Sequence, residues 1–131
     1  MIYTSHFNNI NKLPKDSYLI SLSPIPPISV DADLSLVTPS YILLMCYKEY
    51  KVSNEEFEKL YKYHLEQDFG DIIKNKIRDA LIEISKEHGD VFILNYDNSE
   101  DLLCRRIFTD WLDCGIKEYD TGKGCELNEV Y

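Results

Sequence analysis

The stretch Val91-Phe92-Ile93-Leu94-Asn95-Tyr96-Asp97-Asn98-Ser99 decides the fold of this chain. Its first four residues are all apolar, which is typical of a parallel strand buried on both faces. The polar residues that follow predict a turn. Apolar residues then recur at helical spacing, which predicts a helix from residue 98 or 99 to residue 113. A strand that leads through a turn into a helix is the repeating unit of α/β proteins.

Further strands are expected on both sides of this unit. Residues 1–4 favour β structure, and residues 18–22 predict a second strand that ends where Pro24, Pro26 and Pro27 remove backbone donors. A long loop is expected from there to Leu36. After Gly115, residues 116–119 predict a final strand.

Three helices are expected between the second strand and Val91. Thr38-Pro39 resembles an N-cap followed by proline at the first helical position, which favours a helix over residues 41–47. Ser53 and Glu56 have the spacing of a capping box. The helix that they begin is expected to bury one stripe: Phe57, Leu60, Tyr61, His64 and Leu65. A third helix begins at Asp71, has the stripe Ile73, Ile77, Leu81 and Ile84, and ends at Gly89.

This order of elements predicts an α/β fold: a small, Rossmann-like three-layer sandwich with a mostly parallel sheet of about four strands and helices on both faces. Residues 1–120 are expected to form a single domain and residues 121–131 a polar C-terminal tail.

Composition narrows the possible partners and location. The net charge of −9 argues against broad nucleic-acid binding, which depends on Lys and Arg that neutralise phosphates. No apolar stretch is long enough to cross a membrane, and no secretory signal is expected. The four cysteines have no C-x-x-C spacing, which fits free thiols in the cytoplasm. Ten tyrosines would suit a surface that binds a protein partner or a second copy, or simply reflect biased composition.

Polar residues follow each predicted strand, and parallel strands bring their carboxyl ends to one edge of the sheet. The candidate ligand-binding residues at this edge are Thr4, Ser5, Ser21, Ser23, Asn95 and Tyr96, with Arg105 and Arg106 from the following helix. We expect them to suit a small anionic or nucleotide-like ligand. No cluster has metal-ligand spacing, and no cofactor is predicted.

Cys104 is the candidate nucleophile. Its place near the beginning of a helix, beside Arg105 and Arg106, would favour a thiolate. Arg106 could then hold a phosphate or carboxylate, and Asp97 or His6 could transfer a proton. The alternative is that Cys104 is a small core residue, because it shares a helix face with Phe108.

The order of these segments resembles the family catalogued as domain of unknown function 488. The resemblance covers residues 1–120: an opening Ile2-Tyr3-Thr4 strand, Ser23-Pro24, Thr38-Pro39, a polar turn after the late strand, and a triplet at residues 104–106. Members have Cys-His-Arg in that triplet, so Arg105 replaces the histidine here. Asp97 stands where the family more often has glutamate. The resemblance implies a Rossmann-like α/β sandwich with a site around the triplet, but it implies no reaction.

Two classes of function follow. The chain is either a thiol-dependent enzyme or phosphate-ligand protein that uses Cys104, Arg106 and Asp97 or His6, or a non-catalytic module. In the second case Asn95, Tyr96, Asp97 and Arg106 would bind a nucleotide-like ligand or a protein, and Cys104 would be structural.

Overall fold

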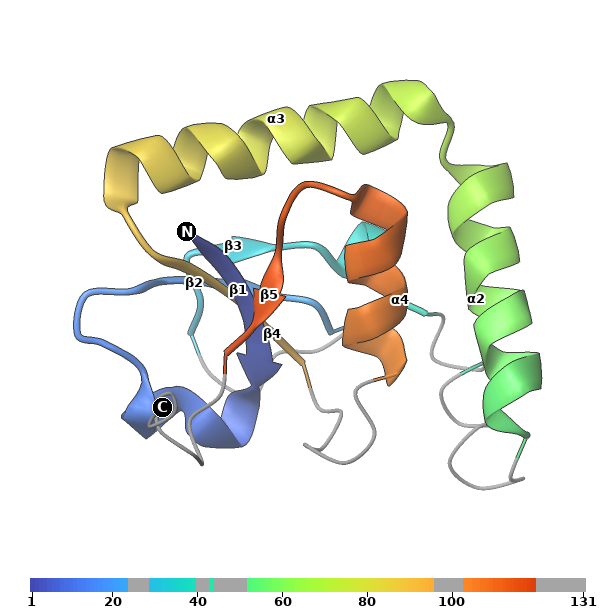
Figure 1. The fold of residues 1–131 in the computed structure, drawn as a ribbon, viewed down its shortest axis with the longest axis horizontal. Helices are drawn as coiled ribbons and strands as arrows, with labels where there is room; N and C mark the ends of the chain where they lie inside the picture. The colour runs from blue at the N-terminus through green and yellow to red at the C-terminus, as the bar shows by residue number, and fades with distance from the viewer. Residues whose placement is uncertain (24–28, 40–42, 44–51, 96–102, 120–131) are drawn as a thin grey trace.

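The fold is shown by a computed structural model that describes residues 1–23, 29–39, 43, 52–95 and 103–119 (Figure 1). The strands are β1 (Ile2–His6), β2 (Tyr18–Ser21), β3 (Ala32–Asp33), β4 (Val91–Asn95) and β5 (Lys117–Glu118). The α-helices are α2 (Asn54–Asp68), α3 (Asp71–His88) and α4 (Leu103–Leu112), and the short 3-10 helices are η1 (Phe7–Lys12) and η2 (Ser35–Val37).

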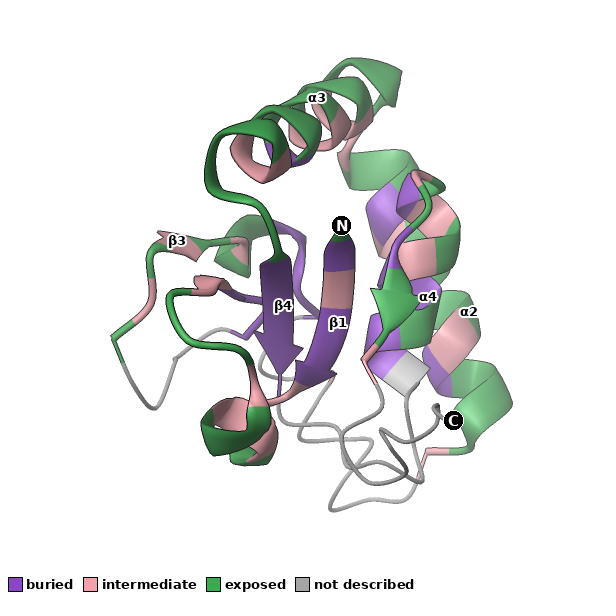
Figure 2. Cartoon of the chain, turned by 60° about the vertical axis from the view of Figure 1, so that its left-hand side comes forward, coloured by how far each residue is buried: buried purple, intermediate pink, exposed green. Residues whose placement is uncertain are grey.

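The strands form one parallel sheet in the order β3-β2-β4-β1-β5, which confirms the predicted α/β fold. β4 lies between β1 and β2, and all five of its residues are buried (Figure 2). The sheet has five strands where about four were expected. The additional strand is β3, which has only two residues and lies inside the predicted loop.

The two faces of the sheet are covered differently. Ile2, Ile20 and Ile93 point toward the main core, to which α2, α3 and α4 contribute, whereas Phe92 and Leu94 point to the other face, near η1. The connection from β1 to β2 contains η1 and runs along one face of the sheet. The connections that contain α2, α3 and α4 lead back in the opposite direction along the other face. This use of faces is expected when all crossovers have the same hand. Among the described residues, the helix on the second face is therefore the 3-10 helix η1.

The helix boundaries follow the local signals. The capping box at the beginning of α2 is present, since the Ser53 hydroxyl accepts from the backbone N–H of Glu56 at 3.1 Å. Gly89 ends α3 with a φ of 84°, in the region that favours glycine. Only part of the α2 stripe is buried: Phe57, Tyr61 and Leu65 are buried, but Leu60, predicted to be buried, is 52% exposed.

Some sequence predictions lie outside the described residues. They include most of the helix expected at residues 41–47, where only Leu43 is described and is helical, the beginning of the helix expected at residue 98 or 99, and the tail at residues 121–131. Within the described part of the chain, no helix is both long and apolar enough to span a membrane.

Candidate functional site

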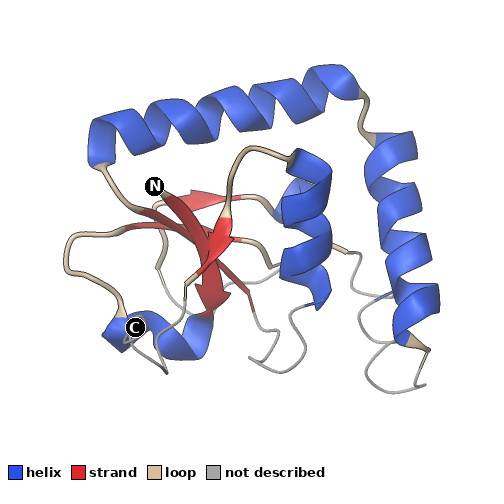
Figure 3. Ribbon diagram, in the orientation of Figure 1, coloured by secondary structure: helices blue, strands red, loops and turns tan. Residues whose placement is uncertain are grey.

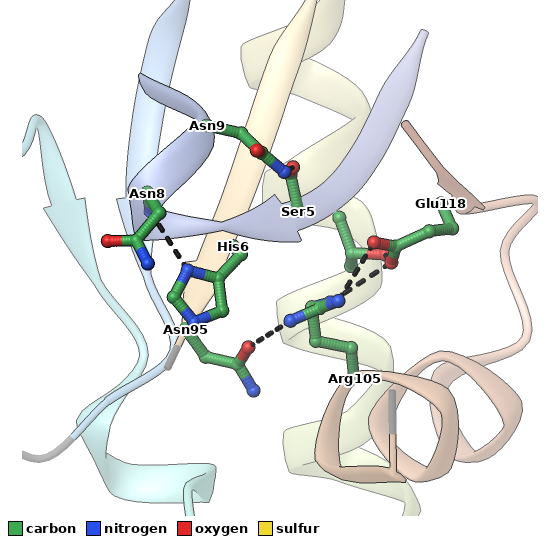
Figure 4. A network of polar contacts seen from close by, with 8 residues as sticks. Ser5, His6, Asn8, Asn9, Asn95, Arg105 and Glu118 are labelled. Carbon is green, nitrogen blue, oxygen red and sulfur yellow. Dashed lines mark hydrogen bonds and ion pairs between the residues drawn. The ribbon is translucent and has the colours of Figure 1, made fainter. Parts of the chain in front are cut away.

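Arg105 is the central side chain of the candidate site. It is 1% exposed and is the largest side chain among the fully buried ones. Its Nε donates to Glu118 Oε1 at 3.0 Å, and its Nη2 donates to Glu118 Oε2 at 2.9 Å. Its Nη1 donates to Asn95 Oδ1 at 2.7 Å (Figure 4). The paired bonds to one carboxylate fix the plane of the guanidinium group as well as its position.

The register of the sheet explains why these residues meet. Thr4 of β1 is paired with Glu118 of β5, and the last residue of β1, His6, is paired with Asn95 of β4. Since side chains alternate along a strand, Thr4 and His6 share a face of the sheet with Ile2, the face that α4 covers. Thr4 Oγ1 donates to Glu118 Oε1 at 2.8 Å, so that one carboxylate accepts three hydrogen bonds.

His6 lies beside Asn95 at the end of the strands (Figure 4). Its Nδ1 accepts from the backbone N–H of Asn8 at 2.9 Å, so His6 is also the N-cap of η1. When the His6 ring is neutral and Nδ1 accepts this hydrogen bond, the ring proton is on Nε2. His6 is half-buried, in contrast to the buried Arg105. The site therefore combines a buried cation with a half-exposed imidazole.

Among the described contacts, none joins Ser5, Ser21 or Ser23, the three serines predicted at the same edge, to this cluster. Ser5 alternates with Thr4 and His6 and therefore points to the opposite face, where Asn9 Nδ2 donates to its Oγ at 3.0 Å. Ser21 is fully buried, and its Oγ donates to the carbonyl oxygen of Ser23 at 3.5 Å. The predicted residues lie near this edge, but the pleat divides them between two faces of the sheet.

Arg106 points away from the edge. It is about half-exposed and pairs with Glu58 Oε1 at 3.0 Å and Asp110 Oδ2 at 3.7 Å. Successive residues of a helix point about 100° apart, so Arg105 and Arg106 cannot both face the sheet. In this structure Arg106 joins α4 to α2, which lie side by side (Figures 1 and 3).

Cys104 belongs to the hydrophobic core. It is 3% exposed and lies in the same cluster as Ile107 and Phe108. Cys114 is more accessible, and burial raises the pKa of its thiol; nearby Arg78 lowers it in part and Asp113 raises it. The other two candidates, Tyr96 and Asp97, lie outside the described residues.

Glu118 is the site residue that the sequence did not reveal. It follows Lys117 in a short predicted strand, where an acidic side chain is usually a solvated surface group. Its role depends on the pairing of β5 with β1, which brings residues 114 positions apart into contact. A buried arginine needs a carboxylate partner, but the sequence does not indicate which of its 23 acidic residues provides it.

Within the described residues, no group of three or more His, Cys, Asp or Glu side chains is placed to hold a metal ion. Comparison of the chain with protein-family models, with curated proteins and with solved structures finds no match.

Proposed function

We propose that this chain is a non-catalytic module that binds a small nucleotide-like ligand at the carboxyl edge of its sheet, beside His6, Asn95 and Arg105. The observation that supports the proposal is the buried Arg105, held by Glu118 and Asn95 where β1, β4 and β5 end. Ligands of parallel α/β sheets bind outside the carboxyl ends of the strands.

The ion pair with Glu118 favours one class of ligand over another. The carboxylate offsets the charge of Arg105 at a distance of 2.9 Å, so the attraction for a bare anion is weak. Recognition then depends on directed hydrogen bonds rather than on net charge, and the half-buried imidazole of His6 is the most accessible group of the cluster. A nucleotide-like molecule, which has both donors and acceptors, matches such a surface better than inorganic phosphate does.

The burial of Cys104 supports the non-catalytic alternative over the thiol enzyme. A catalytic thiol is partly exposed in an electropositive setting, whereas Cys104 is packed among core residues. The adjacent Arg105 side chain is already directed to Glu118 and Asn95. In this proposal Cys104 is structural. The resemblance to the family of domain of unknown function 488 and the cytoplasmic location remain parts of the same proposal, supported by the sequence.

The ligand proposal is tested by thermal unfolding with AMP, GMP, CMP, UMP and inorganic phosphate as probes. At least one nucleotide is expected to raise the Tm of the wild type in a concentration-dependent way, because a ligand that binds only the folded state stabilises it. His6→Asn should reduce this shift while keeping a side-chain acceptor for the N–H of Asn8. His64→Asn, on the outer part of α2, is the matched control and should keep the full shift.

A Tm that no nucleotide changes, or a shift that is the same in His6→Asn and in the wild type, would overturn the proposal. A shift with inorganic phosphate as large as that with nucleotides would assign the site to simple anions instead.

The structural role of Cys104 is tested by alkylation followed by mass spectrometry. Cys104 should resist alkylation until the protein unfolds, because its thiol is 3% exposed. Cys114 should react in the native protein, with a rate that rises only above the usual pH range of a free thiol, since its pKa is raised. Rapid native alkylation of Cys104 with a low apparent pKa would contradict the proposal and favour the thiol enzyme.

A further inference from the structure

A second candidate site lies under α3, on the side of the sheet formed by β2 and β3. It is a cavity of about 390 Å³ whose walls are almost entirely aliphatic. Four residues of α3, Ile73, Ile77, Leu81 and Ile84, line one wall, and Leu34 and Val37 line the other. Its volume falls within the range of about 300–1,000 Å³ that is usual for small-molecule sites. None of its lining residues belongs to the Arg105 cluster.

Among the described residues, α3 is only partly covered, and this leaves the cavity beneath it. Leu81 is buried, whereas Ile73, Ile77 and Ile84 are only half-buried, although all four form one stripe. The sheet beneath them ends at β3, which has two residues. Aliphatic surface that faces a cavity of this size gains stability when an apolar group fills it.

Two charged residues, Asp33 and Lys76, line the cavity, and they differ in the hydrogen bonds that they already make. Asp33 Oδ1 accepts from the backbone N–H of Ser35 at 2.5 Å, so its carboxylate is engaged at the beginning of η2. Lys76 is exposed, and within the described part of the chain no hydrogen bond or ion pair involves it. An ammonium group at the end of an aliphatic stem, beside an aliphatic cavity, complements a carboxylate on an apolar tail.

We propose that this cavity binds an amphipathic aliphatic carboxylate, with its chain against the isoleucines of α3 and its carboxylate at Lys76. A second copy of this chain is a less suitable occupant, because two molecules of net charge −9 repel each other. The site is separate from the proposed nucleotide-like site, so either can fail without the other.

The experiment is isothermal titration calorimetry of the wild type with decanoate and with decanol, which share a tail and differ in the head group. Decanoate should bind more tightly than decanol. Lys76→Glu should weaken decanoate binding about three- to tenfold, as expected for the reversal of one exposed charge, and leave decanol binding unchanged. Lys59→Glu, on α2 and outside the cavity lining, makes the same change in net charge and should leave both affinities unchanged.

Ala80→Phe places a large side chain in the cavity wall without removing any cavity residue and should abolish the binding of both probes. Circular dichroism confirms that the variant is folded, and Ala80→Leu serves in its place if it is not. Failure of decanoate to bind, or binding that Lys76→Glu and the Ala80 variants leave unchanged, would overturn the proposal. A wild-type dimer in sedimentation that Ala80→Phe dissociates would also overturn it, because a second copy would then occupy the cavity.

Discussion

Two neighbouring arginines of α4 show how one residue position changes the role of a side chain. Arg105 is fully desolvated and has a carboxylate fixed against it, whereas the side chain of Arg106 is 48% exposed and pairs with Glu58 at the surface. A buried charge that loses its partner cannot regain water, but an exposed one can. The shortest distances of the two pairs are similar, 2.9 Å and 3.0 Å, but Arg105 donates to both oxygens of Glu118 and is buried, whereas Arg106 makes one hydrogen bond to Glu58 and is exposed.

We expect Glu118→Gln to lower the free energy of unfolding by about 1–3 kcal/mol, because it removes the carboxylate that forms two hydrogen bonds with the buried Arg105. Glu58→Gln, which breaks the exposed pair of Arg106, should cost less than about 1 kcal/mol. Urea unfolding monitored by circular dichroism measures both. If the two variants are equally stable, the Arg105 pair does not contribute through its burial.

A double-mutant cycle measures the interaction energy between Arg105 and Glu118. Arg105→Met combined with Glu118→Gln should be less destabilising than the sum of the two single changes, since neither charge is then left alone. Additive effects would mean that the two side chains do not interact energetically.

At this scale the sequence predicted part of the candidate site. The sequence predicted that four polar residues near the ends of strands would lie together: Thr4, His6, Asn95 and Arg105. The structure brings these residues together. The sequence could not predict Glu118, because the partner of a buried arginine depends on strand order. It also could not assign Ser5 to the opposite face, because a one-residue difference in where the strand begins would reverse every side chain.

Among the elements, α4 connects the sheet to the outer helix α2. Its buried face provides Arg105 and the core residues, and its exposed face provides Arg106, which pairs with Glu58 of α2. Glu58 also pairs with Lys62 at 2.7 Å. Hydrogen bonds from Lys62, and then from Arg106, hold the pKa of Glu58 below its usual value of 4.5.

This lowered pKa predicts a dependence of stability on pH. A carboxylate whose pKa is lower in the folded than in the unfolded state stabilises the fold above the unfolded value, and this contribution is lost as pH falls through the folded value. The stability difference between the wild type and Glu58→Gln should therefore be complete at neutral pH, begin to fall near pH 4.5 and vanish only once the pH is below the lowered pKa of the folded state. Urea unfolding at several pH values measures it. A difference that does not change between neutral and acidic pH would contradict the prediction.

The elements that were predicted correctly are those with strong local signals. The capping box at Ser53, the glycine at the end of α3 and the apolar run of β4 each act within a few residues. β3 could not be predicted, because its two residues form a strand only through pairing with Ile20 and Ser21. Leu60 was expected to be buried, but the buried residues of α2 are Phe57, Tyr61 and Leu65, a narrower stripe than predicted.

At the scale of the whole molecule, the position of a strand within the sheet determines how well its backbone amides are protected from hydrogen exchange. β4 has strand partners on both sides and no exposed residue, whereas β3 and β5 are two-residue strands at the ends of the sheet order. Amide hydrogen exchange measured by mass spectrometry should therefore be slowest in peptides that contain residues 91–95, and faster by at least an order of magnitude around residues 32–33 and 117–118. Equal rates would mean that the sheet opens only as one unit.

The position of β4 between β1 and β2 has a consequence for synthesis. Of the described strands, β1 pairs only with β4 and β5, so during synthesis it has none of these partners until the chain has been made as far as residue 95. At about 5–20 residues per second this delay is roughly ten seconds, during which Ile2 and the other apolar side chains of the nascent segment stay uncovered. β1 is thus completed by a strand that is made much later, and a chain interrupted before residue 91 lacks the strand that joins β1 to β2.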